Sequence, residues 1–201
     1  MTADRRLRVG GWAALLVAIL APLELGALFL VAHESDPFAA PAVVLITATR
    51  AGALLAAAIG LDGLFVSVAA GPARTARTAG ITGSILLLAY ALLQTTIGPD
   101  AGTVVVVGFA GRVLTGAWFI AGGVILMSGG RQLARVGWAA GLGGVGTIAA
   151  ALAIAVPFGG PVGVGSSWLD WFLLLGLFVV VYLVRVWSYV VRGRLPGPGI
   201  L

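Results

Sequence analysis

The sequence predicts an all-α protein, a bundle of six transmembrane helices that forms a single domain over residues 1–201. Apolar residues make up 60% of the chain and charged residues only 9%, and the mean hydropathy is +1.11. This composition lies far outside the range of a soluble domain. Basic segments also return at regular intervals along the chain, which is typical of a multispanning membrane protein.

Six apolar runs are long enough to cross about 30 Å of hydrocarbon, which takes roughly 20 helical residues. Glycine and proline separate them, and we expect the first inner loop at Gly71-Pro72 and the second outer loop at Gly98-Pro99-Asp100. The first run follows Arg5-Arg6, as in a signal peptide, but its length and Glu24 favour a retained helix. The predicted helices are 9–32, 42–69, 80–98, 102–128, 136–157 and 167–190.

Small residues recur at four-residue spacing on two of these helices, as they do where membrane helices pack closely. Gly52, Ala56 and Gly60 form such a stripe on the second helix, and Gly137 and Gly141 form another on the fifth. We expect each stripe to face a neighbouring helix. The alternative is that both reflect the general abundance of glycine in membrane helices.

The arginines determine the predicted orientation. Nine of them lie in polar segments at residues 5–8, 74–77, 131–135 and 192–194, and the chain has no lysine. The polar segments between these clusters contain Glu34, Asp36 and Asp100, and no arginine or lysine. Because cytoplasmic loops carry the basic residues, both termini are expected in the cytoplasm. The arginines form no stripe beside aromatic residues, so the lipid bilayer is the expected partner and nucleic acid is not.

Several kinds of chemistry are not expected because the residues for them are missing. The chain has no cysteine, and its single histidine, His33, lies in the first outer loop. A disulfide framework, a thiolate or histidine metal site, a bis-histidine haem site and a histidine-dependent triad are therefore excluded. The sequence also lacks a Walker loop, a G-x-S-x-G motif and an H-E-x-x-H motif. We predict no catalytic residue, no metal and no cofactor.

Six ionisable residues fall inside the predicted helices, where an unpaired charge costs about 3 kcal/mol or more. Glu24 and Arg50 lie at matching depth in the outer half and are predicted to form an ion pair, with Arg112 close to the same level. Asp62 and Arg185 share a depth in the inner half, where a second ion pair is predicted. The six residues are Glu24, Arg50, Asp62, Arg112, Asp170 and Arg185.

Two interpretations of these charges remain open. In the first, the pairs only fix helix register, with Asp170 and Arg185 reaching toward the interfaces. In the second, two arginines against one acid at one depth form an outward-facing cavity for an anion or a polar headgroup, since the planar guanidinium suits carboxylates and phosphates. The candidate ligand-binding residues are Glu24, Arg50, Gln94, Thr95, Arg112, Thr115 and Asp170.

Three features give the chain a resemblance to a known family. An arginine, Arg50, begins the second long helix, and an acid, Asp62, follows three turns later. A basic loop at 129–135 leads into a glycine-rich helix. The last helix closes at 187–193 with tryptophan, aliphatic residues, an arginine and a glycine. In these features the chain resembles a large bacterial family of polytopic membrane proteins known only as a domain of unknown function. It departs from that family at 179–181, where three valines stand in place of an acid. The resemblance implies six or seven helices and no known reaction.

Three functions follow as alternatives. The first is a non-enzymatic protein of the bacterial cytoplasmic membrane, an accessory, sensing or ligand-binding component with a polar site in its outer half. The second is a small secondary transporter or lipid-handling protein that uses a cavity at Arg50 and Arg112. The third is an intramembrane enzyme with Glu24 or Asp62 as its acid–base group. The expected partners are an anionic ligand or lipid headgroup, and a membrane-protein partner or a second copy of the chain.

Overall fold

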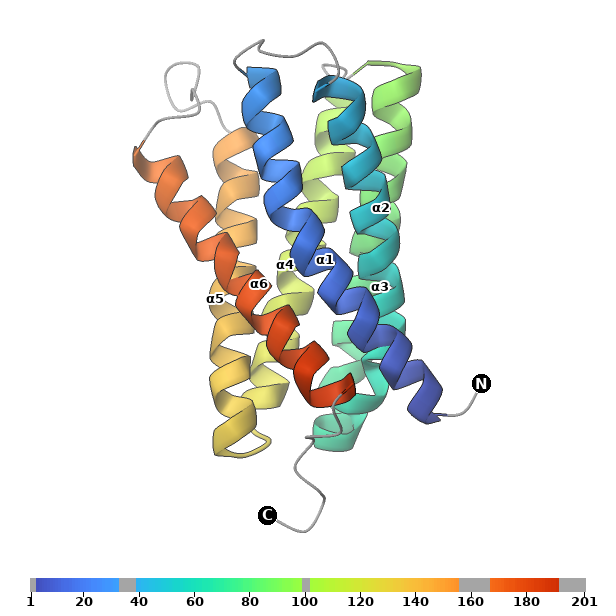
Figure 1. Ribbon diagram of the computed structural model, residues 1–201, viewed down its shortest axis with the longest axis vertical. Coiled ribbons are helices and arrows are strands. Elements are labelled where there is room, and N and C mark those ends of the chain that lie inside the picture. The colour runs from blue at the N-terminus through green and yellow to red at the C-terminus, as the bar shows by residue number, and fades with distance from the viewer. Residues whose placement is uncertain (1–2, 33–38, 99–101, 156–166, 192–201) are drawn as a thin grey trace.

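The computed structural model describes residues 3–32, 39–98, 102–155 and 167–191. The regular secondary structure of this part of the chain consists of six α-helices and no strand, which confirms the predicted all-α class. Figure 1 shows the helices side by side along the long axis of the molecule. They are α1 (Ala3–Ala32), α2 (Ala39–Gly60), α3 (Asp62–Thr96), α4 (Gly102–Met127), α5 (Arg131–Ala155) and α6 (Ser167–Val191).

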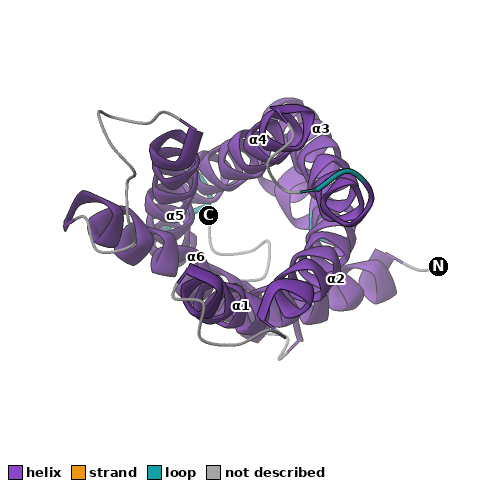
Figure 2. Cartoon of the chain, turned by 90° about the horizontal axis from the view of Figure 1, so that it is seen from above, coloured by secondary structure: helices purple, strands orange, loops and turns teal. Residues whose placement is uncertain are grey.

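The six helices form a closed ring. Each helix packs against the helices before and after it in the sequence, and α6 packs against α1 to close the ring. Figure 2 shows this arrangement from above. Because packed helix axes are about 8–10 Å apart, helices on opposite sides of a six-membered ring are about 16–20 Å apart. The side chains that point inward therefore determine the chemistry of the interior.

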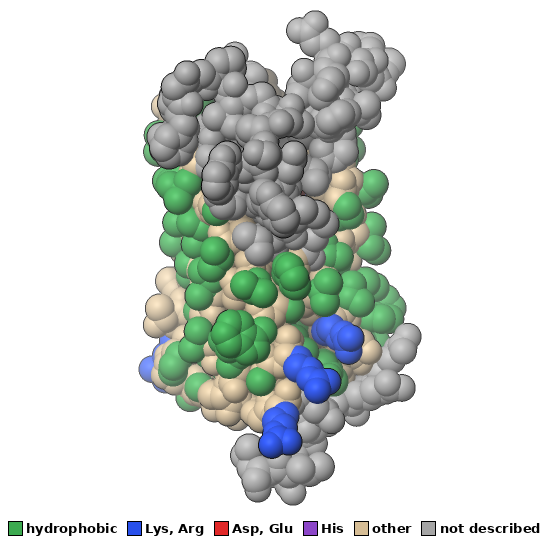
Figure 3. Space-filling view, turned by 90° about the vertical axis from the view of Figure 1, so that its left-hand side faces the viewer, with side chains coloured by type: hydrophobic (Ala, Val, Ile, Leu, Met, Phe, Trp, Pro, Cys, Tyr) green, Lys and Arg blue, Asp and Glu red, His purple; other side chains and the backbone are tan. Residues whose placement is uncertain are grey.

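Arginine is concentrated at one end of the ring. The helices α1 and α5 begin at the lower end of the molecule in Figure 1, and α6 ends there. Figure 3 shows arginine side chains in the lower part of one face, below a broad hydrophobic band. We call this end the arginine-rich end; its arginines in the described helices are Arg5, Arg6, Arg8, Arg74, Arg77, Arg131, Arg135 and Arg185.

Four segments in the described part of the chain are long and apolar enough to cross a membrane: Arg5–Glu24, Pro41–Gly60, Asp62–Thr96 and Gly102–Met127. A shorter apolar stretch, Phe178–Val191, lies in α6. Large apolar side chains point outward along these helices as well as inward. Helices that are apolar on all sides are typical of protein interiors or of membranes. The outward-facing examples include Ile19, Leu45, Leu92, Val106 and Val124, each more than half exposed.

The chain reverses its direction where the second predicted helix, 42–69, ends. The helix α2 ends at Gly60 and α3 begins at Asp62, but Leu61 N–H donates to Ala57 O at 2.8 Å and Phe65 N–H donates to Leu61 O at 3.2 Å, so helical hydrogen bonding continues across this boundary. The predicted inner loop at 70–79 is helical instead. A straight helix would separate residues 62 and 77 by about 22 Å. However, Asp62 and Arg77 form an ion pair with an N–O distance of 3.2 Å. The chain therefore folds back between them, at Ala69, whose dihedral angles are extended (φ −154°, ψ 94°).

Gly71-Pro72, which was predicted to form a loop, belongs instead to the first helical turn after this reversal. The first four N–H groups of a helix have no partner within the helix, so the missing N–H of Pro72 costs no hydrogen bond there. The same dipeptide is therefore compatible with the start of a helix. Helices α1 and α5 also begin before the predicted residues, because their hydrogen bonding continues through the arginines that flank the apolar runs.

Glycine allows the closest helix contacts. On α4 and α5, a Cβ atom at Gly137 would lie 2.5 Å from the carbonyl oxygen of Gly123, and one at Gly144 would lie 2.6 Å from that of Gly116. Distances this short leave no room for a larger residue. The glycines on each helix are seven residues apart, so they return to nearly the same face after two turns. The α4–α5 contact therefore follows a seven-residue repeat.

The two predicted small-residue stripes are each only partly in contact. Gly60 packs against Gly10 of α1, and Gly137 packs against α4, but a Cβ atom at Gly52 or Gly141 would have no neighbour within 4 Å. Each step of four residues turns the helix by about 40° beyond a full revolution. Gly52 is two such steps from Gly60, so it has rotated away from the α1–α2 contact. The backbone N of Gly141 still lies 2.9 Å from a Cβ built at Gly123, but the Cβ direction of Gly141 itself points away from α4.

Four large aromatic side chains are buried toward the arginine-rich end of the ring. Trp118 and Phe119 of α4, Tyr182 of α6 and Phe65 of α3 are each 1% exposed. The ring centroid of Phe119 lies 5.0 Å from that of Trp118 and 5.9 Å from that of Tyr182. Since α4 and α6 are not neighbours in the ring, the contact between Phe119 and Tyr182 crosses the interior. We call these four residues the aromatic layer.

Candidate functional site

Polar side chains from four successive helices lie in the half of the ring away from the arginine-rich end. Glu24 lies eight residues before the end of α1, and Arg112 lies ten residues after the start of α4. Each is therefore about 12–15 Å below the end of its helix. We call the group the polar cluster; its members are Glu24, Thr47, Arg50, Tyr90, Gln94 and Arg112.

Glu24 of α1 is held by two residues of α2. Its carboxylate forms an ion pair with the guanidinium of Arg50 and accepts a 2.8 Å hydrogen bond from Thr47 Oγ1. The Glu24 side chain is 7% exposed and that of Arg50 is 23% exposed, so the pair is largely withdrawn from solvent. The structure thus brings together the two predicted partners. Thr47 was missed, although its position three residues before Arg50 places both on one helix face.

Arg112 of α4 stacks on Tyr90 of α3. The guanidinium carbon lies 4.9 Å from the centroid of the tyrosine ring, within the range of a cation–π interaction. Gly108 makes room for this contact, because a Cβ atom there would lie 2.6 Å from Tyr90 Cδ2. Among the described residues, Arg50 pairs with Glu24 and Arg77 pairs with Asp62, and neither ion pair involves Arg112. The positive charge of Arg112 is thus supported by an aromatic ring and by no described carboxylate contact.

Glu24 and Arg112 belong to helices on opposite sides of the ring. The charge of Arg112 acts on Glu24 more weakly than the charge of Arg50 does. This interaction passes through the interior of the ring. The described members of the cluster include two guanidinium groups and one carboxylate. Their formal net charge is therefore positive, as expected from the sequence.

Two buried polar atoms of the cluster have no hydrogen-bond partner among the described residues. They are Nε of Arg50, which is a donor, and Oε1 of Gln94, which is an acceptor. The other amide atom of Gln94, Nε2, donates a 2.7 Å hydrogen bond to the hydroxyl of Tyr90. Gln94 Oε1 therefore lies beside the stack of Tyr90 and Arg112. An unsatisfied buried polar atom costs about 1–3 kcal/mol, which a bound group that completes the hydrogen bond recovers.

Two predicted threonines bond to their own helices instead of to the cluster. Thr95 is exposed, and its hydroxyl donates to the carbonyl oxygen of Leu92 at 2.7 Å. Thr115 is 1% exposed, and its hydroxyl donates to the carbonyl oxygen of Gly111 at 2.7 Å. Local bonds of this type are common for threonine within helices. The side chain of Asp170, the remaining predicted site residue, lies outside the described residues, as do His33 and Asp100.

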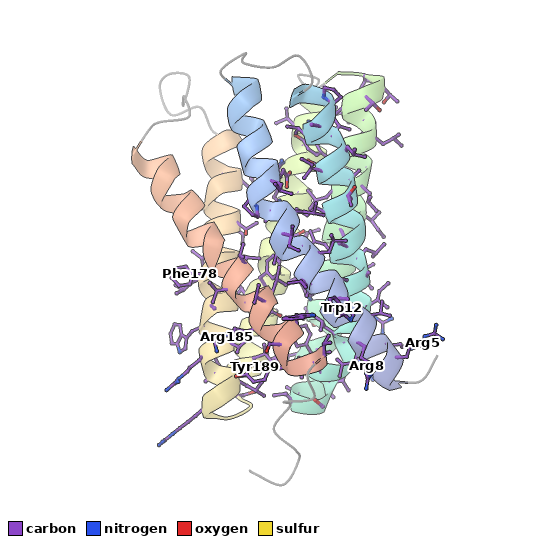
Figure 4. All side chains as sticks on the ribbon, viewed as in Figure 1. Arg5, Arg8, Trp12, Phe178, Arg185 and Tyr189 are labelled. Carbon is purple, nitrogen blue, oxygen red and sulfur yellow. The ribbon has the colours of Figure 1, made fainter. Side chains whose placement is uncertain are left out.

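The predicted inner ion pair of Asp62 and Arg185 is wrong. Nη1 of Arg77 lies 3.2 Å from Oδ2 of Asp62, whereas Arg185 is exposed on α6 in the lower half of Figure 4. The prediction treated residues 70–79 as a loop. Because the chain instead reverses at Ala69 and continues as a helix, Arg77 returns to the level of Asp62. The Arg77 side chain is 50% exposed, so solvent weakens this pair.

The polar cluster has the chemistry of an anion site. Guanidinium groups bind carboxylates and phosphates through paired N–H donors, and stacking on Tyr90 leaves the in-plane donors of Arg112 free for such a group. A search of the described residues finds no group of three or more acidic, histidine or cysteine side chains arranged to hold a metal ion.

Comparisons of the chain with protein-family models, curated proteins and solved structures found no match.

Proposed function

We propose that the protein is a multi-pass protein of the bacterial cytoplasmic membrane that binds an anionic ligand inside its ring of helices without transforming it. Arg112 carries the proposal. Its guanidinium stacks on Tyr90 and lies beside Gly108, about 9 Å below the end of α4, and no described carboxylate pairs with it. A guanidinium without an ion-pair partner is costly in a low-dielectric bundle, so an anion bound there would stabilise the folded protein.

The proposed orientation follows from the distribution of charge. Cytoplasmic segments of membrane proteins are rich in arginine and lysine. With the arginine-rich end in the cytoplasm, both termini are inside, and the polar cluster lies in the outer half of the membrane. Four apolar segments of sufficient length support the membrane location. An anion would then reach Arg112 from the outer face, which suits a sensing or accessory protein that responds to an external ligand.

The aromatic layer favours binding over transport. A transport path would need polar groups that continue from the polar cluster to the arginine-rich end. The described residues at the corresponding level include Trp118, Phe119 and Tyr182, which are buried and in contact across the interior. The charged pair below them, Asp62 and Arg77, is partly exposed and sits near the chain reversal. A site with a closed inner side binds its ligand and releases it to the same face.

Ligand-induced stabilisation tests this proposal. A ligand present at one hundred times its Kd stabilises the folded state by about 2.7 kcal/mol. Purified protein in phosphatidylcholine nanodiscs is heated with increasing sodium phosphate or sodium propionate, at constant ionic strength. The wild-type melting temperature should rise with one of these anions, and Arg112→Gln should abolish the rise.

Arg185→Gln is the matched control, because Arg185 is exposed at the arginine-rich end. It should leave the anion response unchanged. An equal rise in wild type and Arg112→Gln would contradict the proposal. Uptake of the same anion, radiolabelled, into proteoliposomes separates binding from transport, and Arg112-dependent uptake would support the transporter instead.

A further inference from the structure

The unsatisfied atoms of the polar cluster describe the ligand more closely than its charge does. Arg112 and Arg50 Nε supply hydrogen-bond donors, whereas Gln94 Oε1 is an acceptor. A simple carboxylate satisfies the donors but has no hydrogen to give to Gln94. A ligand that satisfies both kinds of atom must therefore carry a negative charge and a hydrogen-bond donor in the same small group.

We infer that the ligand of the polar cluster is an oxyanion with a hydroxyl group close to the charge, as in a hydroxycarboxylate or a glycerol phosphate. This inference rests on the proposed function and adds the chemical class of the ligand. The oxyanion bonds to the free edge of Arg112 and to Arg50 Nε, while the hydroxyl donates to Gln94 Oε1. Tyr90 links the two ends of the site, because it stacks on Arg112 and accepts a hydrogen bond from Gln94.

The positions along the helices set the direction of the ligand. Gln94 lies one turn from Tyr90 toward the end of α3, which places it about 6 Å closer to the outer end. The oxyanion is then the deeper group, and the hydroxyl lies toward the opening. The aromatic layer, which begins six residues after Arg112 on α4, limits the depth of the site.

The same chemistry is present in a free metabolite and in the headgroup of phosphatidylglycerol, which has both a phosphate and hydroxyl groups. The guanidinium of Arg112 lies beside Gly108, about 9 Å below the end of α4, a depth that does not separate the two sources. The experiment therefore includes an arm with each source.

Two matched pairs of ligands measure the contribution of the hydroxyl. Affinities for lactate and propionate, and for glycerol 3-phosphate and methyl phosphate, are determined at pH 8 by thermal stabilisation of the full chain in phosphatidylcholine nanodiscs. At this pH both phosphates are predominantly dianions, so only the carbon-bound hydroxyls differ as donors. Wild type should bind the hydroxylated member of at least one pair about tenfold more tightly.

Substitutions at Gln94 assign that preference to one atom. Gln94→Met keeps the length of the side chain and removes the acceptor, so the tenfold preference should fall to about one. Gln94→Glu keeps an acceptor and adds negative charge, so it should weaken binding of all four anions and retain the preference. Thr95→Val is the control, since Thr95 is the exposed neighbour whose hydroxyl bonds to its own helix.

Replacing half of the phosphatidylcholine with phosphatidylglycerol identifies the source of the ligand. Competition by the lipid, lost in Gln94→Met, would assign the site to the headgroup, and an unchanged affinity would assign it to the free anion. Equal affinities within both pairs would overturn the inference while leaving the proposed anion site intact. If the wild-type protein bound none of the four anions, both the inference and the proposed anion site would be overturned.

Discussion

Glu24 is a buried carboxylate in an apolar ring of helices, and its immediate partners explain how the fold accommodates it. Arg50 supplies the opposite charge and Thr47 a second hydrogen bond, both from α2. Removing one member of a buried pair is costly because the remaining charge is left without compensation. Replacing both members leaves no uncompensated charge, although the ion pair itself is also lost. The pair therefore fixes the register of α1 against α2 in addition to any part it plays in binding.

A double-mutant cycle tests the Glu24–Arg50 pair. Glu24→Gln and Arg50→Gln should each destabilise the protein by about 3–5 kcal/mol, because each leaves an uncompensated buried charge. The double variant should lose much less than the sum of the two. Stability is measured by thermal unfolding in detergent without added anion. Strictly additive losses would show that the two side chains do not interact.

Thr47→Val separates the hydrogen bond from the ion pair. It removes the 2.8 Å hydrogen bond to Glu24 while keeping the shape of the side chain and both charges. Hydrogen bonds to charged groups contribute about 1.5–3 kcal/mol. The loss of thermal stability should therefore be smaller than that of Arg50→Gln in the same detergent. A loss as large as that of Arg50→Gln would mean that Thr47, and not the ion pair, dominates the stability of this contact.

At the scale of helices, glycine determines how closely neighbours approach. The α4–α5 contact uses Gly116 and Gly123 on one helix and Gly137 and Gly144 on the other. Van der Waals packing between closely spaced backbones is a main source of stability for helices surrounded by lipid. A methyl group added within this contact must separate the helices. One added outside it meets nothing.

Gly137→Ala and Gly141→Ala test this contact with the same chemical change on the same helix. Gly137→Ala places a methyl group 2.5 Å from Gly123 O and should cost about 1–3 kcal/mol by overpacking. Gly141→Ala meets no atom within 4 Å and should be neutral or slightly stabilising, since alanine is the better helix former. The two melting temperatures are compared in one detergent. A greater loss for Gly141→Ala would contradict the helix contact described above.

The chain reversal at Ala69 depends little on the ion pair that crosses it. The Arg77 side chain is half exposed, and exposed ion pairs contribute about 0–1 kcal/mol. Asp62→Asn should therefore lower the melting temperature only slightly, and the difference from wild type should shrink further at high salt. A loss comparable to that of Glu24→Gln would show that Asp62 is shielded from solvent in the assembled protein.

At the scale of the whole molecule, the distribution of arginine separates the two ends of the ring. Eight arginines of the described helices lie at the arginine-rich end, and the two in the opposite half, Arg50 and Arg112, belong to the polar cluster. The ring therefore has a basic end and a single basic site in its interior. In the proposed orientation, the basic end meets the anionic inner leaflet of the membrane.

Cysteine labelling tests the orientation, because the chain has no cysteine of its own. Thr75→Cys reports on the arginine-rich end and Thr96→Cys on the opposite end, and both positions are exposed. An impermeant maleimide added to intact cells should label position 96 and should label position 75 only after permeabilisation. Labelling of position 75 alone in intact cells would reverse the proposed topology.

The sequence alone predicts the helical class, the approximate helix positions and the depth of Glu24, Arg50 and Arg112 along their helices. These follow from hydrophobic length and from the rise per residue, which depend on local sequence alone. It also anticipated the Glu24–Arg50 pair, because both residues are charged at one depth on helices joined by a short connection. The surplus of arginine at that depth was visible for the same reason.

Which side chains come into contact depends on how the helices pack against one another. Because the chain reverses at Ala69, Asp62 pairs with Arg77 and not with Arg185. Hydropathy did not predict this reversal, because it cannot distinguish a loop from a helical turn that begins at Gly71-Pro72. The stacking of Arg112 on Tyr90 depends on the order of helices in the ring and on the rotation of each about its axis. These arrangements are set by packing between helices, which the sequence of any one helix does not contain.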